Sequence, residues 1–211
     1  MFYLSCSNQS PHELTQISPP PLEDPNKPVI HFLDVAEEVG FIWSHNNGAS
    51  EMKFFPETMS GGGAFFDADN DGDLDIYAVD GGNLSDLKKD RPRNALFINK
   101  SGHFKEISDA SGANDQGYGM GVSVGDIDGD GDNDLYVTNF GSNVMYQNNS
   151  GTFIDVSIQS KTDDPLWGAS AAFSDYDLDG EFDATISITG DSNINGYYFS
   201  GNDSICLQNH N

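Results

Sequence analysis

Three short stretches of the chain concentrate carboxylates at a regular spacing. They are DADNDGDLD (67–75), DIDGDGDND (126–134) and DYDLDGEFD (175–183), each with acids at positions 1, 3, 5, 7 and 9 and glycine at position 6. Alternating carboxylates on a loop that turns sharply at a glycine can converge on one point, where they would hold a divalent cation. We therefore predict three metal-binding loops.

Calcium is the ion that these ligands favour. The carboxylates at positions 1, 3, 5 and 9, the backbone carbonyl at position 7 and water would supply the roughly six to eight oxygens that Ca²⁺ prefers. No histidine or cysteine lies in any loop, which disfavours zinc and copper. Mg²⁺ ranks second because it requires stricter octahedral geometry. The predicted ligands are Asp67, Asp69, Asp71, Asp73 and Asp75; Asp126, Asp128, Asp130, Asp132 and Asp134; and Asp175, Asp177, Asp179, Glu181 and Asp183.

Two other interpretations of the loops fit less well. An EF-hand needs a bidentate glutamate at position 12 and flanking helices, whereas position 12 is Ala78, Val137 or Ile186 in a strand-like run. A solvated acidic turn explains one copy but not three of equal internal spacing. We expect about three calcium ions with a structural role.

The acidic loops belong to longer repeats. A segment rich in small residues precedes each loop (59–66, 118–125 and 167–174), and an alternating apolar run follows it (74–79, 133–138 and 182–187). Further on, NALFINKSGHFKEIS (94–108) matches NVMYQNNSGTFIDVS (143–157), with a Ser-Gly turn between two strand-like runs. Each copy predicts four short strands, and such units at a period of about 40–50 residues indicate blades of an all-β propeller. No helix is expected within 61–211.

The repeats define the expected domain organisation. The blades span approximately 59–108, 117–157 and 167–211, with the third incomplete, inside a propeller region of residues 29–211. VIHFLDVA (29–36) resembles the fourth strands and is expected to be a leading fourth strand. Because propellers need about four to eight blades, the chain is expected to be the N-terminal part of a longer protein.

The N-terminal tail (1–28) has two interpretations. Its small residue before Cys6 and its polar, proline-rich continuation resemble a bacterial lipoprotein, in which Cys6 would carry the lipid and the tail would be a tether. Only five residues precede Cys6, far fewer than in a usual signal segment, so a disordered N-terminus is the alternative interpretation. The lipid at Cys6 is the only membrane attachment that we expect.

The charge of the chain limits its partners. Acidic residues number 34 against 9 basic ones, for a net charge of −25, so a nucleic-acid partner is not expected. Three divalent ions would change the net charge to −25 + 6 = −19, still strongly acidic. No apolar run approaches the length that a membrane-spanning helix requires.

The repeats resemble known families. The loops and the small residues before them resemble the FG-GAP/VCBS repeats of integrin α-subunit propellers. Residues 32–82, with His45, Asn47-Gly48 and Pro56-Glu57-Thr58 before the first loop, resemble the ASPIC (cartilage acidic protein) family. The resemblance implies an extracellular or cell-surface, calcium-binding propeller of about seven blades.

Binding is the function that the sequence favours. We expect a module that binds a protein or glycan, and no catalytic residue is assigned. GVSVG (121–125) has the spacing of a hydrolase nucleophile elbow around Ser123, but it leads into an acidic loop rather than a helix. The alternatives are a scaffold or appended domain of a carbohydrate-active enzyme and a purely structural spacer.

Overall fold

The computed structural model describes residues 32–84, 91–175, 183–190 and 203–207. The chain divides into two units, Met1–Asp34 and Val35–Asn211, and the second contains all of the described helices and strands. Among the described residues, no helix has both the length and the apolar character that crossing a membrane would require.

Two complete antiparallel sheets follow each other along the chain. Their strands are hydrogen-bonded in sequence order, β1-β2-β3-β4 and β5-β6-β7-β8. The prediction of an all-β fold built from four-stranded blades is confirmed. The strands are β1 (Gly62–Phe66), β2 (Asp75–Val79), β3 (Ala95–Lys100), β4 (His103–Glu106), β5 (Gly119–Gly125), β6 (Asp134–Asn139), β7 (Gly141–Asn149) and β8 (Thr152–Asp155).

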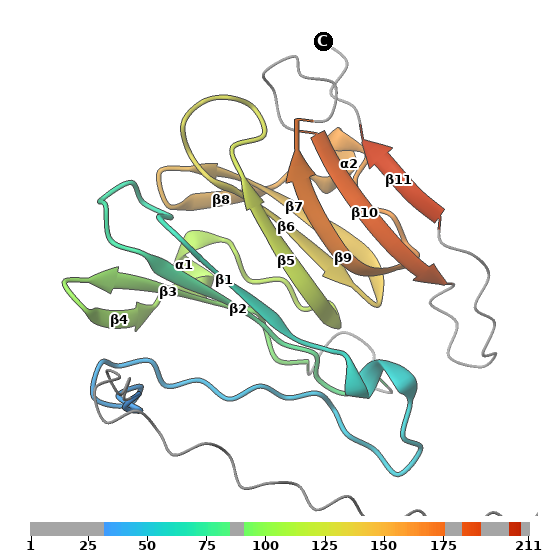
Figure 1. Cartoon of the computed structure of the whole chain (residues 1–211), viewed down its shortest axis with the longest axis horizontal. Coiled ribbons are helices and arrows are strands. Elements are labelled where there is room, and N and C mark those ends of the chain that lie inside the picture. The colour runs from blue at the N-terminus through green and yellow to red at the C-terminus, as the bar shows by residue number, and fades with distance from the viewer. Residues whose placement is uncertain (1–31, 85–90, 176–182, 191–202, 208–211) are drawn as a thin grey trace, which may run out of the picture. The chain divides into compact units, whose positions relative to one another are not determined.

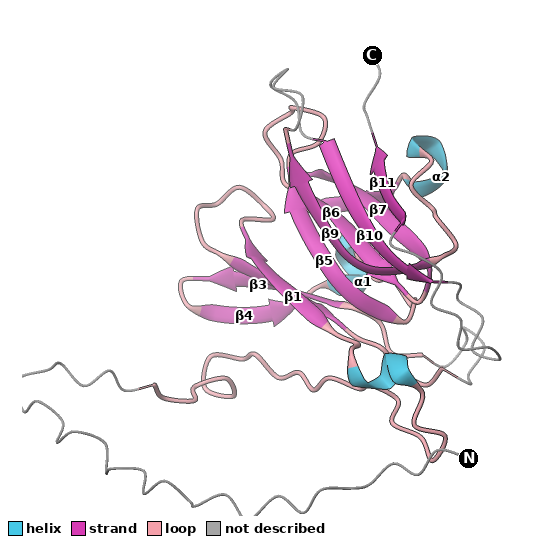
Figure 2. Cartoon of the chain, turned by 45° about the vertical axis from the view of Figure 1, so that its right-hand side comes forward, coloured by secondary structure: helices cyan, strands magenta, loops and turns pink. Residues whose placement is uncertain are grey.

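A third sheet continues the series. Its described strands are β9 (Trp167–Ser174), β10 (Asp183–Gly190) and β11 (Asp203–Leu207), in the order β11-β10-β9. The first strands of successive sheets are neighbours, since β1 contacts β5 and β5 contacts β9 (Figures 1 and 2). The small residues of these strands allow this close approach of one sheet to the next.

The main hydrophobic core lies between the first two sheets. It contains large side chains from both, which alternate along the strands with side chains of the opposite face. Burial of these side chains is what holds blade 1 (β1–β4) against blade 2 (β5–β8). The buried core residues include Phe66, Tyr77, Val79 and Leu96 of blade 1, and Leu135, Val137, Tyr146 and Phe153 of blade 2.

Two single-turn helices correct the expectation that no helix lies within 61–211. They are α1 (Ser108–Ser111) and α2 (Ser157–Ser160), and each follows the last strand of a blade. Ser108 Oγ accepts a hydrogen bond from the backbone N–H of Leu96 at 3.0 Å, and Ser157 Oγ accepts one from that of Met145 at 2.9 Å. One turn is too short to show an apolar periodicity, so the pattern gave no signal.

The N-terminal segment (residues 35–60) packs on blade 1. The ring centroid of Phe41 lies 4.8 Å from that of Phe97, and Val39 accepts a hydrogen bond from the N–H of Phe104 at 2.7 Å. The segment ends in the 3₁₀ helix η1 (Phe55–Thr58), directly before β1 (Figure 2). Residues 32–36 do not form the predicted leading strand, since none of the described strands pairs with them; residues 29–31 lie outside the described residues.

The approach of β5 to blade 1 leaves no room for a side chain at Gly119. A Cβ atom there would lie 2.2 Å from Val79 Cγ1 and 2.7 Å from the carbonyl oxygen of Asp80. We expect Gly119→Ala to lower the free energy of unfolding by about 1–3 kcal/mol, because blade 2 must move away from β2. Ser123→Ala in the same strand is the control and should leave urea denaturation nearly unchanged. Equal midpoints for the two variants would contradict the close approach.

Candidate metal centres in the acidic loops

Two of the acidic loops occupy equivalent places in their blades. The first joins β1 to β2 and the second joins β5 to β6. Each is hydrogen-bonded to the turn between the third and fourth strands of its blade. Asp177, Asp179 and Glu181 of the third loop lie outside the described residues.

The carboxylate at position 9 points into the protein. Asp75 accepts hydrogen bonds from the backbone N–H groups of Ala68 and Asn99, both at 2.7 Å. Asp134 is equivalent: its carboxylate accepts from Ile127 and Asn148, both at 2.8 Å, and both aspartates are fully buried. Position 9 therefore joins the start of the loop to the third strand.

The carboxylates at positions 1, 3 and 5 converge. One oxygen from each of Asp67, Asp69 and Asp71 lies within 4.8 Å of the others, and the same holds for Asp126, Asp128 and Asp130. These are the two clusters in the described part of the chain that could hold a metal ion. Positions 1, 3 and 5 were among the predicted ligands; the position-9 carboxylates are not part of either cluster.

The position-1 carboxylate also shapes the loop. Asp67 accepts hydrogen bonds from the backbone N–H groups of Asp71 at 3.1 Å and Gly72 at 2.9 Å. Asp126 accepts the equivalent hydrogen bonds from Asp130 at 3.1 Å and Gly131 at 2.9 Å. The glycine at position 6 has a φ of +90° or +94°, a conformation that other residues rarely adopt. This turn brings positions 1, 3 and 5 together.

The position-7 side chain faces the neighbouring turn. Asp73 accepts a hydrogen bond from the N–H of Ser101 at 2.9 Å, and Asp132 accepts one from the N–H of Ser150 at 2.6 Å. Position 7 can therefore offer its backbone carbonyl to an ion while its carboxylate fixes the turn.

The residues of the first loop fit a hard cation. Asp69 Oδ1 is buried and has no hydrogen-bond partner in the described structure. Buried carboxylate oxygens are otherwise almost always paired, so this atom marks a missing partner. A cation among oxygen donors would provide it, and calcium or magnesium matches a site of oxygens alone.

A lysine distinguishes the first loop from the second. Lys100 Nζ lies 2.8 Å from Asp69 Oδ2 and also pairs with Asp71. These hydrogen bonds raise the pKa of Lys100, and the bond from Lys100 is the main cause that lowers the pKa of Asp71. The equivalent residue of the second repeat is Asn149. In the second cluster, Asp128 instead accepts a hydrogen bond from the neutral side-chain amide of Gln147.

Burial perturbs the position-9 carboxyls. It raises the pKa of Asp75, and it raises the pKa of Asp134 to about 6, against an ordinary value of 3.8. The hydrogen bonds that each carboxylate accepts from backbone N–H groups lower its pKa and so oppose this upward shift. The charges of Asp128 and Asp130 add to it at Asp134. Without an ion, each loop therefore holds a carboxyl that is reluctant to ionise.

Sequence reasoning missed the amides that support these loops. Asn99 and Asn148 donate to the carbonyls of Leu74 and Asn133, at 3.1 and 3.0 Å. The Oδ1 atom of each accepts the N–H of the following turn glycine. Both asparagines occupy the same position in the aligned strings 94–108 and 143–157, which was the available signal.

Comparison with known families places these loops at the start of a recognised repeat. A family model described as an FG-GAP-like repeat matches residues 67–137 and again 126–186, which together cover more than half of the chain. Both matches begin at the first residue of an acidic loop. A search of curated proteins found no match.

Lys100 should compete with a cation for the first loop. We expect Lys100→Ala to raise the calcium affinity of that loop by about three- to tenfold, because two exposed ion pairs no longer need to be broken. The backbone amide signals of Gly72 and Gly131 in NMR titrations report the two loops separately. Lys105→Ala, an exposed lysine on β4, is the matched control and should change neither affinity. An unchanged Gly72 titration in Lys100→Ala would argue against competition.

The raised pKa of Asp134 predicts how the ion-free protein responds to pH. Between pH 4 and 6 the folded protein keeps a proton that the unfolded chain has lost, so the free energy of unfolding should fall as pH rises. Urea denaturation in EDTA measures this. With calcium the slope should reverse, because ion binding needs deprotonated carboxylates. An ion-free stability that rises across this interval would contradict the assignment.

Proposed function

Since the chain belongs to the FG-GAP-like repeat family, we propose that it is a calcium-stabilised, extracellular β-propeller module that binds a protein or glycan. The observation that carries the calcium assignment is the convergence of three carboxylates in each of two described loops. The two clusters occupy equivalent places in their blades, which indicates a repeated binding site rather than a chance concentration of charge.

The ion's role is structural in this proposal. Three like charges within 4.8 Å of one another repel, and a divalent cation removes most of that repulsion while fixing the loop between two strands. Fifteen of the 34 acidic residues lie in the three acidic loops. Calcium binding to these loops therefore also reduces the electrostatic self-repulsion of the whole chain.

Two arguments favour an extracellular location for a module with this structural calcium. Modules that bind calcium outside cells work at affinities of roughly 10⁻⁴–10⁻³ M, which loops with open, partly exposed ligands can supply. The resemblance of residues 32–82 to ASPIC proteins points the same way. Attachment through a lipid at Cys6 would place the module at a cell surface.

The proposal includes no catalytic step. Ser60 Oγ lies 3.2 Å from His45 Nε2, and His45 Nδ1 lies 3.3 Å from Asp80 Oδ1, which is the order of a hydrolase triad. The N–H of Gly61, which follows the serine, is already donated to the carbonyl of Gly119, so it offers no donor to an oxyanion. The three side chains instead link the N-terminal segment to the end of β2.

Thermal unfolding with and without calcium tests the proposal. We expect millimolar Ca²⁺ to raise the unfolding midpoint by several degrees relative to excess EDTA, because an ion that binds only the folded state stabilises it by linkage. A cooperative transition with the same midpoint in both conditions would refute the calcium assignment.

A matched pair of variants localises the effect. Asp128→Asn removes one ligand of the second cluster and should reduce the calcium-dependent rise. Asp163→Asn removes the same charge from an exposed site outside the loops and should preserve the rise. An equal loss in both variants would attribute the stabilisation to net charge rather than to the loop.

A further inference from the structure

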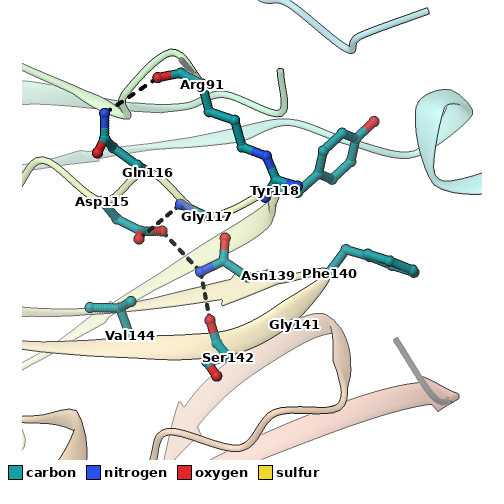
Figure 3. A pocket seen from close by; sticks show the side chains of 10 residues that line it. All are labelled: Arg91, Asp115, Gln116, Gly117, Tyr118, Asn139, Phe140, Gly141, Ser142 and Val144. Atoms are coloured by element: carbon teal, nitrogen blue, oxygen red, sulfur yellow. Dashed lines mark hydrogen bonds between the residues drawn. The ribbon is translucent and has the colours of Figure 1, made fainter. Parts of the chain in front are cut away.

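A cavity lies at the end of blade 2 opposite its acidic loop. The acidic loop follows Gly125 at one end of β5, whereas the cavity adjoins Gly119 at the other end. Its volume is about 300 Å³. The segment that links blades 1 and 2, the β6–β7 turn and one residue of the β2–β3 connection line it (Figure 3). The lining includes Arg91, Asp115, Gln116, Tyr118, Asn139 and Phe140.

The amide of Asn139 has a fixed orientation in the wall of this cavity. Its nitrogen donates to Asp115 Oδ2 at 2.9 Å and to the carbonyl oxygen of Ser142 at 3.0 Å. Two acceptors on one side require the nitrogen there, so the oxygen points away from both (Figure 3). Asn139 is 1% exposed, and its Oδ1 has no hydrogen-bond partner in the described structure. The wall therefore contains a buried acceptor that lacks a donor.

Gly117 maintains the shape of this wall. A Cβ atom at that position would lie 2.4 Å from both Cγ and Oδ1 of Asn139. Any side chain would displace the amide, so the glycine leaves room for it. The Gly117 N–H donates to Asp115 Oδ1 at 3.0 Å, which positions the carboxylate beside the amide.

The carboxylate of Asp115 has capacity for further hydrogen bonds. It accepts bonds from the amide of Asn139 and from the backbone N–H groups of Gly117 and Gln116, and a carboxylate has about four acceptor positions. Burial raises the pKa of Asp115, while these same bonds lower it. A donor from a ligand would relieve part of this desolvation.

The remaining lining groups determine which class of ligand the cavity favours. Arg91 donates to the carbonyls of Asn83 and Leu84, at 3.3 and 3.5 Å, which keeps a positive charge at the cavity. The formal charges of Arg91 and Asp115 in the same lining are opposite, so together they favour a neutral ligand over an ammonium or guanidinium group. Phe140, which is only partly buried, adds aromatic surface to the lining, and the buried ring of Tyr118 supports it, with the two ring centroids 6.4 Å apart. A neutral ligand with several hydroxyl groups and an apolar C–H face matches this combination of acceptors and an aromatic ring.

We propose that this cavity binds a single sugar unit of a glycan. Hydroxyl groups would donate to Asp115 and, with a small movement of the wall, to Asn139, while a C–H face would pack on the aromatic lining. The inference rests on the proposed binding function, because it assigns that function a site and a ligand class. The site lies at the opposite end of the sheet from the calcium loops, so calcium would stabilise it without contacting the sugar.

NMR titration of the calcium-loaded chain tests this inference. The probes are glucose, galactose, mannose and N-acetylglucosamine at tens of millimolar, with N-acetyl-lysine amide as a basic probe. The reporters are the backbone amides of Gly117 and Gly141 and the side-chain amide of Asn139. We expect at least one sugar to shift all three saturably, and the basic probe to shift none.

Three variants connect the signals to the cavity. Ser142→Tyr places a large side chain at an exposed lining position, and Asp115→Asn removes the acceptor charge with little change of shape. Each should weaken sugar binding at least tenfold. Thr152→Tyr adds the same bulk at an exposed position on β8 and should bind like the parent chain. Equal unfolding midpoints in calcium would show that the variants are folded.

The outcomes separate this inference from the proposed function. If no sugar shifts the reporters while calcium still stabilises the chain, the sugar site is refuted and the calcium assignment stands. If only N-acetyl-lysine amide shifts them, the cavity accepts a basic side chain of a protein partner, and the glycan inference is wrong. If a sugar shifts them but calcium has no effect on stability, the sugar site stands and the calcium assignment fails.

Discussion

Each complete blade depends on a carboxylate that points inward from an acidic loop. Asp75 and Asp134 are fully buried, and removing a carboxylate from water is costly unless hydrogen bonds replace the solvent. Two backbone N–H groups do so in each case, one from the loop and one from the third strand. This pairing sets the position of the loop relative to the sheet, and the other acids of the loop can then face a common point.

The same region also connects one blade to the next. Asn148 of blade 2 donates to the carbonyl of Ala68 in the first acidic loop at 2.9 Å, and Asn70 of that loop donates to Asp132 in the second. The loop of one blade therefore contributes to the surroundings of the next loop. An ion in the first loop would restrain a segment that blade 2 also contacts, so its influence need not end at its own blade.

The sequence was sufficient to predict the strands and the convergence of the carboxylates at positions 1, 3 and 5. Both follow from two-residue periodicities that recur in each copy of the repeat. It was insufficient for α1 and α2, whose single turns have no period, and for residues 32–36, where similarity to a strand did not supply a pairing partner. The inward direction of Asp75 depends partly on the backbone N–H of the distant Asn99, and the cavity depends on three segments far apart in sequence. Such features follow from the packing of blades and have no local pattern.

The chain contains two tryptophans, and they occupy different surroundings. Trp167 is buried at the start of β9, with its ring centroid 5.3 Å from that of Phe140 and 6.0 Å from that of Phe55. Trp43 lies on the N-terminal segment, 5.9 Å from the imidazole of His45. Their intrinsic fluorescence therefore reports on different contacts. Separation of the third sheet from the second would shift the emission of Trp167, whereas detachment of the N-terminal segment from blade 1 would expose Trp43, which packs on Ala78, Ala95 and Phe97, and would move its emission to longer wavelength.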